Sequence, residues 1–117
     1  RAVLQGVSFA IADATDVLKE AGATPDRLMA TGGGANNLTW LSCIASATGI
    51  PIDRPADGDF GAAFGAARLA MMADGAHMSE VCHKPDIATT VLPDAGLAER
   101  LHPARERWQQ IYRLLRG

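Results

Sequence analysis

The chain has 117 residues, of which 48% are hydrophobic, and a formal net charge of −2. This apolar fraction supports a packed core and excludes a disordered chain. The nearly neutral charge offers no basic field for nucleic acid or an anionic membrane surface, and two cysteines are too few for a disulfide framework and fit a reducing cytoplasm.

The uncharged stretch 28–52 has to be tested as a membrane span. A lipid-spanning helix would not place three glycines and two amides near its start, as this stretch does. The first residues also lack the basic start and apolar block of a signal peptide. We therefore expect a buried segment of a cytoplasmic protein that has no membrane partner.

The first predicted element is an amphipathic helix over residues 2–20, because apolar side chains recur there every three or four positions. Gly22 suits the left-handed position that follows a helix. Residues 28–31 form a short apolar run that glycines stop, and its length predicts a buried strand.

A second helix is predicted over residues 38–48, with Gly49 at its end. Its expected inward face consists of Trp40, Leu41, Ile44 and Ala45. Residues 50–53 read as a second short strand, and Pro51 within it predicts an edge strand or a strand start.

A third helix is predicted over residues 60–74, and Asp57 or Asp59 in the preceding turn can cap it. Capping is a better interpretation of these two carboxylates than a metal site or a general base. The helix is rich in small residues. Because glycine weakens a helix, Gly61 and Gly65 predict close approach to another backbone or to a ligand.

Residues 75–96 read as irregular, and Pro103 is expected in the first turn of a final helix. The predicted apolar stripe of this helix consists of Ala104, Trp108, Ile111, Tyr112 and Leu115. Its four arginines, Arg105, Arg107, Arg113 and Arg116, read as a solvated face. Trp108 and Tyr112, four positions apart, indicate core or interface packing.

The predicted order is helix, strand, helix, strand, helix, irregular arm and C-terminal helix. Alternating elements imply an α/β fold, a sheet covered by helices. Two strands are few for a stable sheet, so we expect further strands upstream.

The segment with the clearest chemical signal is the glycine turn at residues 32–34, between the first strand and the second helix. Glycines let a ligand touch bare backbone, and a helix start offers free N–H groups with partial positive charge. Asn36 or Asn37 can cap the helix or contact a base. The simpler alternative is a tight turn with an asparagine cap.

Two phosphate-binding motifs do not fit this turn. No Gly-Lys-Ser/Thr follows the glycines, as a P-loop requires. A dinucleotide fingerprint would need glycine where Asn37 stands, although Asp53 is near enough to the expected acidic position to keep that interpretation as a weak alternative.

Three blocks of sequence resemble the FGGY family of carbohydrate kinases. Residues 1–10 resemble the helix that opens the last third of these kinases, and 32–35 followed by Trp40 resemble their adenine-binding turn. Residues 61–70 resemble their small-residue helix. The order and spacing of the blocks also fit, and the likeness covers nearly the whole chain.

The resemblance implies two actin-like ATPase domains, of the ribonuclease H-like type, with ATP and sugar in the cleft between them. Residues 1–117 would be the C-terminal part of the second, nucleotide-binding domain, cut at Arg1 within a helix, and the N-terminal sugar-binding domain would be absent. The catalytic aspartate and the groups that bind Mg²⁺ and phosphate would also lie upstream. No catalytic residue is therefore expected here, and the fragment alone should not phosphorylate sugar.

The resemblance also assigns the cofactor site. Gly33, Gly34 and Ala35 would lie along the adenine and ribose of ATP or ADP, and Asn37 matches a position whose polar side chain faces the purine. The glycine face at Gly61 and Gly65 would pack beside the same pocket.

The final helix, with Trp108 and Tyr112, resembles that of the family members that phosphorylate D-xylulose to xylulose 5-phosphate. Glycerol, ribulose, erythritol and gluconate remain alternative substrates. A non-catalytic nucleotide-binding module and a dinucleotide-binding piece of an oxidoreductase remain alternative functions. Members often pair, so a homodimer is possible. The chain departs from the family pattern at Gln5, Asn36–Asn37, Ser42 and Ser46.

A metal site is a weak alternative. His77, Cys82 and His83 match no zinc spacing and lack an evident fourth ligand. Cys43 reads as a buried, inert thiol.

Overall fold

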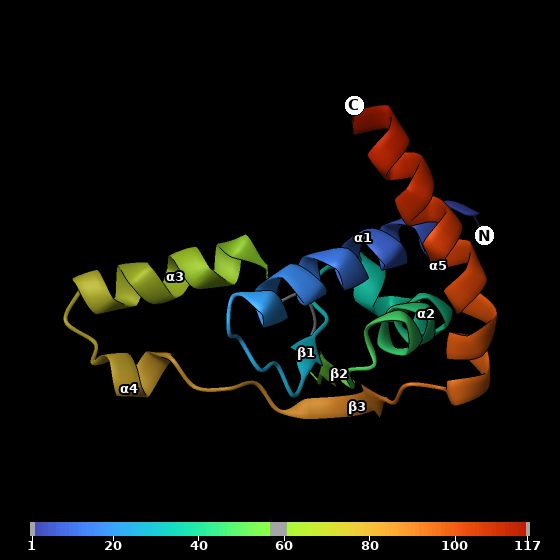
Figure 1. The fold of residues 1–117 in the computed structure, drawn as a ribbon. Coiled ribbons are helices and arrows are strands. Elements are labelled where there is room, and N and C mark those ends of the chain that lie inside the picture. Colours follow the sequence, from blue (N-terminus) through green and yellow to red (C-terminus); the bar gives the residue numbers. More distant parts are fainter. Residues whose placement is uncertain (1, 57–60, 117) are drawn as a thin grey trace.

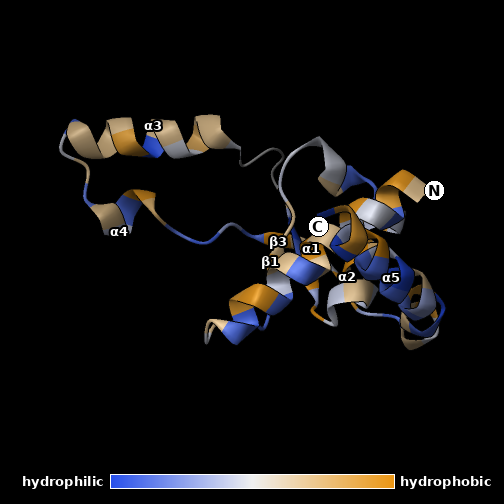
Figure 2. Ribbon diagram, turned by 45° about the horizontal axis from the view of Figure 1, so that its top comes forward, coloured by the Kyte–Doolittle hydropathy of each residue, from blue (hydrophilic) through white to orange (hydrophobic). Residues whose placement is uncertain are grey.

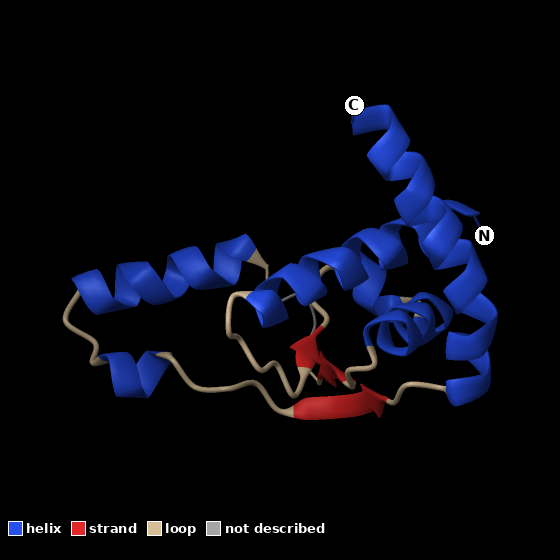
Figure 3. Cartoon of the chain, in the orientation of Figure 1, coloured by secondary structure: helices blue, strands red, loops and turns tan. Residues whose placement is uncertain are grey.

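The computed structural model describes residues 2–56 and 61–116. Along the chain they form α1 (Ala2–Glu20), β1 (Leu28–Met29), the 3-10 helix η1 (Gly33–Asn36), α2 (Leu38–Thr48), β2 (Ile52–Pro55), α3 (Ala62–Ala73), α4 (Met78–Val81), β3 (Ile87–Val91) and α5 (Ala95–Arg116). Figures 1 and 3 show α1, α2 and α5 gathered on one side of the strands, while α3 and α4 extend away as an arm.

The first two predicted helices are confirmed: α1 spans Ala2–Glu20 and α2 spans Leu38–Thr48. Gly22, with φ of 94°, and Gly49, with φ of 70°, follow them in the left-handed region. A side chain is strained at such a φ, so these two glycines end the helices at low cost.

The core forms where α2 meets α1 and the sheet. Its buried members are Leu41, Ile44, Ala45 and Ile52, and the partly buried Ile11, Leu28, Ala30, Trp40 and Val91 pack against them. The predicted inward face of α2 is thereby confirmed for Leu41, Ile44 and Ala45, whereas Trp40 is half-buried at its edge.

The sheet has three strands in the order β1-β2-β3, one more than the sequence predicted. β1 pairs parallel to β2, with Leu28 opposite Ile52, and β3 pairs antiparallel to β2, with Val91 opposite Ile52. The interpretation of 75–96 as irregular was wrong for β3 and for the single turn of α4. Three of the five β3 residues are exposed, so the strand lacks the apolar alternation that would identify it.

Of the two positions predicted for Pro51, the edge strand is wrong, because β2 is the middle strand of the described sheet. The strand start is close to what is observed, because β2 begins at the next residue. The Pro51 carbonyl accepts a hydrogen bond of 2.9 Å from the Leu28 N–H. Pro55 ends β2 at a register shift, where a residue without an N–H is tolerated.

Asp53 joins the strands through one buried carboxylate. Its Oδ1 accepts hydrogen bonds from Arg27 Nη1 at 2.8 Å and from Thr90 Oγ1 at 2.6 Å. This arrangement connects β2 to the residue before β1 and to β3. The carboxylate considered for a dinucleotide ribose is therefore bonded within the sheet.

Helix α5 begins eight residues before Pro103, so the prediction that Pro103 starts it was wrong. Asp94 caps the helix: its Oδ1 accepts from the Leu97 N–H, and its own N–H donates to Ser46 Oγ at 3.0 Å. Leu101 is buried before the proline, and Trp108 packs edge-on against Phe9 after it. Packing on both sides of Pro103 offsets the backbone hydrogen bond that proline cannot make.

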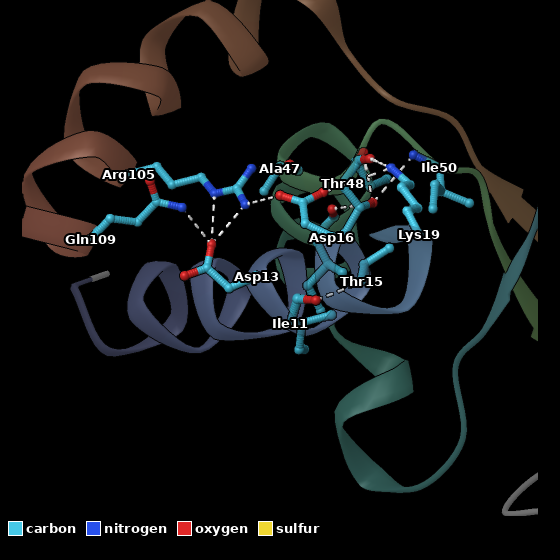
Figure 4. A network of polar contacts seen from close by, with 12 residues as sticks. Ile11, Asp13, Thr15, Asp16, Lys19, Ala47, Thr48, Ile50, Arg105 and Gln109 are labelled. Carbon is cyan, nitrogen blue, oxygen red and sulfur yellow. Dashed lines mark hydrogen bonds and ion pairs between the residues drawn. The ribbon is translucent and has the colours of Figure 1, made fainter. Parts of the chain in front are cut away.

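Arg105 departs from the predicted solvated arginine face of α5 (Figure 4). Its Nη2 donates to Asp13 Oδ1 at 2.7 Å and to Asp16 Oδ2 at 2.6 Å, and its Nη1 donates to the Ala47 carbonyl. Gln109 Nε2 also donates to Asp13 Oδ1. One guanidinium therefore connects α5 to α1 and to the end of α2.

Charge pairing favours the charged form that this guanidinium already has. Desolvation lowers the pKa of Arg105, but hydrogen bonds and Coulomb attraction from Asp13 and Asp16 outweigh it and leave the pKa raised. Arg105 accordingly stays charged across the pH range in which proteins fold.

The arm of α3 and α4 gives the molecule its extended shape. The radius of gyration is 16.9 Å, whereas a compact chain of this length would have about 13 Å. Helix α3 has no buried residue, although Figure 2 shows it coloured mostly on the hydrophobic side of the scale. An added Cβ at Gly65 would meet no atom within 4 Å, so the predicted close approach is absent within the described chain.

The start of α3 differs from the prediction. Its N-cap position is occupied by Gly61, which makes no side-chain capping hydrogen bond. Asp57 and Asp59, the predicted caps, lie outside the described residues. In the described part of the chain, none of the helices has both the length and the apolar character needed to cross a membrane.

Replacement of Arg105 by methionine tests the connection between α1 and α5. Within the described chain, Arg105→Met leaves Asp13 without a cation and Asp16 with only the distant Lys19, whose Nζ lies 3.9 Å from Asp16 Oδ1. Hydrogen bonds to charged groups contribute about 1.5–3 kcal/mol each. We expect urea denaturation to show a free energy of unfolding lower by about 1.5–3 kcal/mol. The matched control, Arg113→Met on the exposed side of the same helix, should change it by less than about 0.5 kcal/mol. Equal effects of the two substitutions would contradict the assigned role.

Candidate functional site

The glycine turn lies between the end of β1 and the start of α2, as the sequence predicted. Gly32 has φ of 82° and ψ of 178°, a conformation open to glycine alone. The Ala35 N–H then donates to the Gly32 carbonyl at 2.9 Å, and the Asn37 N–H donates to the Gly34 carbonyl at 3.1 Å. These bonds wind residues 33–36 into the single 3-10 turn η1.

Gly33 and Gly34 differ in what surrounds them. A Cβ added at Gly33 would meet no atom within 4 Å. A Cβ added at Gly34 would lie 2.5 Å from Trp40 Cζ3, closer than real side-chain contacts allow. Gly33 therefore presents open backbone, whereas Gly34 is pressed against an aromatic ring of its own chain.

Asn37 occupies the N-cap position of α2. Its Oδ1 accepts a hydrogen bond of 3.1 Å from the Trp40 N–H, which satisfies one of the free donors at the helix start. The carboxamide is exposed, and the same holds for Asn36. The Oδ1 of Asn37 therefore caps the helix, as one of the two sequence interpretations predicted. Among the described residues no bond occupies Nδ2 of this exposed residue, which is left as a donor.

A cavity of about 430 Å³ opens beside the turn. Gly34 and Ala35 from the turn line it, together with Ile11, Leu28, Met29, Ala30, Thr31, Trp40, Leu41, Ile44 and Ile52. Its size and apolar lining are those of sites for small organic ligands. Gly33 and Asn37 belong to the same turn but are not among the lining residues.

A second cavity, of about 670 Å³, lies between α1, α2 and α5, on the other side of Trp40. Gln5 and Ser42, two of the positions that depart from the family pattern, line it beside Cys43. Cys43 is half-buried there, less enclosed than the buried thiol that the sequence predicted. Ser46, another of these departures, accepts a hydrogen bond from the Asp94 N–H and so holds the start of α5.

Helix α3 contributes to neither cavity. The structure therefore brings Gly33, Gly34, Ala35 and Asn37 together, but not Gly61 or Gly65 with them. Trp40, expected only as an inward-facing residue and a family marker, proves to line both cavities. The sequence signal that could have placed Trp40 at this site is its position six residues after Gly34.

His77 in the arm has ordinary polar contacts. His77 Nδ1 lies 2.9 Å from Ser79 Oγ, and the His77 N–H donates to Glu80. Cys82 is exposed. Within residues 2–56 and 61–116, no three His, Cys, Asp or Glu side chains gather as a metal ion would require.

Comparison with known proteins gives a consistent picture. The C-terminal domain of the FGGY family of carbohydrate kinases matches residues 1–73. Over 98% of its length the chain is 37% identical to the xylulose kinase of Escherichia coli (strain K12), and over 99% it is 33% identical to that of Klebsiella pneumoniae. The chain spans 24% of the length of each of these relatives.

Solved structures agree. A xyloylose kinase from Brucella ovis superposes with a TM-score of 0.83 and 43% identity, and xylulose kinase from Rhodospirillum rubrum with 0.76 and 26%. The matches cover 98% and 99% of this chain and 24% of each structure. The fold is accordingly that of a part of an actin-like ATPase domain, as the sequence predicted.

Substitution of Asn37 separates helix capping from other roles. Asn37→Ala removes the acceptor for the Trp40 N–H and should lower the free energy of unfolding by about 1 kcal/mol. Asn37→Asp keeps a capping oxygen and should leave stability nearly unchanged. Asn36→Ala, which alters the neighbouring exposed amide, serves as the control in thermal and urea denaturation. A destabilised Asn37→Asp protein would contradict the capping assignment.

Proposed function

The chain belongs to the FGGY family of carbohydrate kinases, and from this premise we propose that it supplies the adenine-binding part of an ATP-dependent kinase for D-xylulose. The complete enzyme would transfer the γ-phosphoryl group of ATP to a sugar hydroxyl and release xylulose 5-phosphate and ADP. In this proposal residues 1–117 are the later part of the nucleotide-binding domain.

The open backbone at Gly33 is the observation that carries the nucleotide assignment. A purine is flat and can lie directly against backbone atoms where no Cβ intervenes. Gly33 leaves that space free, and the adjoining cavity is large enough and apolar enough to take an aromatic ring. Gly33, Gly34 and Ala35 would therefore line the adenine and ribose.

Asn37 adds polar selectivity to this surface. Its Oδ1 is bonded to the Trp40 N–H, so Nδ2 is the group it can offer to a ring nitrogen of the purine. In this proposal Oδ1 of the amide caps the helix and Nδ2 donates to the ligand. The start of α2 also provides partial positive charge near the turn.

The chemical step belongs to the rest of the enzyme. Phosphoryl transfer needs a base for the sugar hydroxyl and Mg²⁺ to neutralise the phosphates. The proposed role of this chain is to bind and orient the adenosine end of ATP. The cation, the triphosphate and the sugar would be held mainly by the three quarters of the enzyme that correspond to the remaining length of the relatives.

D-Xylulose is the proposed substrate because the similar proteins are named xylulose kinases. Glycerol, ribulose, erythritol and gluconate are the competing substrates that an activity assay should include. We place the enzyme in the cytoplasm, where ATP is available, and propose a homodimer as its assembly.

Gly33→Ala provides the sharpest test of the nucleotide site. The residue has no strained φ and no close neighbour, so alanine should leave the unfolding midpoint unchanged or slightly higher. If a purine lies on this backbone, the added methyl group should weaken ADP binding about tenfold, or about 1.4 kcal/mol. Isothermal titration calorimetry on the complete enzyme measures this, with NAD as the ligand that should not bind. Undiminished ADP affinity would place the base elsewhere.

A second test concerns the division of labour within the enzyme. The isolated 117-residue chain should show no turnover of ATP with D-xylulose, whereas the complete enzyme should phosphorylate it. A coupled assay for ADP release measures both. Turnover by the isolated chain above the blank would refute the assignment of catalysis to the upstream part.

A further inference from the structure

The indole ring of Trp40 lies directly against the backbone of Gly34. An added Cβ at Gly34 would be 2.5 Å from Cζ3, 3.3 Å from Cε3 and 3.5 Å from Cη2, all of which are atoms of the six-membered ring. Two of these distances are tighter than ordinary van der Waals contact. Glycine is therefore required at this position by a side chain of the same molecule, before any ligand is considered.

The position of Trp40 is set mainly by α2. Trp40 lies in the first turn of this helix and packs against the core, and the next residue, Leu41, is 3% exposed. The turn can consequently adapt to the ring, whereas the ring cannot easily retreat from the turn. A side chain added at Gly34 would push the turn outward.

The polar atom of Trp40 does not explain its presence. The indole Nε1 is buried and has no hydrogen-bond partner among the described residues. A buried donor without a partner is destabilising, so a polar bond within the described chain is not what this residue contributes. Its ring packs against the core cluster and also lies beneath Gly34.

We infer that Trp40 is a positioning residue for nucleotide binding: its ring holds the turn at Gly34, so that the neighbouring Gly33 presents its backbone to the purine. This inference rests on the proposed function. It assigns different causes to adjacent glycines, because Gly34 is bare to accommodate Trp40 and Gly33 is bare to accommodate the ligand.

A double-mutant cycle in the complete enzyme tests the inference. The proteins are wild type, Gly34→Ala, Trp40→Phe and the double variant, and phenylalanine retains an aromatic ring but lacks the part of the indole beneath Gly34. With Trp40 present, Gly34→Ala should weaken ADP binding about tenfold and lower the unfolding midpoint. In the Trp40→Phe background the same substitution should cost less than about twofold in ADP affinity.

Gly33→Ala is the matched control for this cycle. Since an added Cβ at Gly33 would meet no atom of the ring within 4 Å, Gly33→Ala should leave the unfolding midpoint unchanged in both backgrounds. Its cost in ADP affinity should be smaller in the Trp40→Phe background, where the ring no longer holds the turn. Equal losses from Gly34→Ala in both backgrounds would overturn the inference. So would a double variant that regains stability but not ADP affinity, because Trp40 would then only be structural.

The outcomes also separate this inference from the proposed function. A wild-type enzyme that binds no ADP would refute the proposed function, and the positioning role would fall with it. The unfolding midpoints would still show whether the ring and Gly34 are coupled. Normal ADP binding with additive losses in the cycle would refute only the role of Trp40.

Discussion

Burial of one face of α2 is the constraint on which the rest of the structure depends. Leu41, Ile44 and Ala45 are removed from water between α1 and the sheet, which fixes both the axis and the rotation of the helix. The residues at its start then have little freedom. Trp40 is held at the edge of the core, and the turn before it must pass over the indole ring.

Each of the three consecutive glycines is consequently explained by a different physical requirement. Gly32 has a positive φ that a side chain would strain, Gly34 faces the ring of Trp40, and Gly33 has open space around it. Gly32 and Gly33 both leave open space, but only at Gly33 does neither backbone strain nor a packed ring account for the glycine. The glycines of this turn therefore meet separate backbone, packing and binding requirements. A substitution at one glycine can test one requirement without the other two.

The two ends of the molecule are stabilised differently. Helix α5 is attached to α1 by the Arg105 ion pairs and by the contact of Trp108 with Phe9, so the C-terminal region belongs to the core unit. The α3 helix has no buried residue, and Arg68, which lies over the Phe64 ring and donates to the His83 carbonyl, packs it onto its own arm. The same sequence thus contains a unit with a core of its own and an arm without one.

The sequence by itself determined the features that depend on neighbours along the chain. Helices α1 and α2, their closing glycines and the glycine turn were predicted from local patterns, and the family from the resemblance of three sequence blocks. Only the tertiary structure decided the pairing of β3, the start of α5 before Pro103, the ion pairs of Arg105 and the contact between Gly34 and Trp40. Helix periodicity and left-handed glycines are local properties of the backbone, whereas strand pairing, ion pairs and ring contacts depend on which distant segments the packing of α2 brings together.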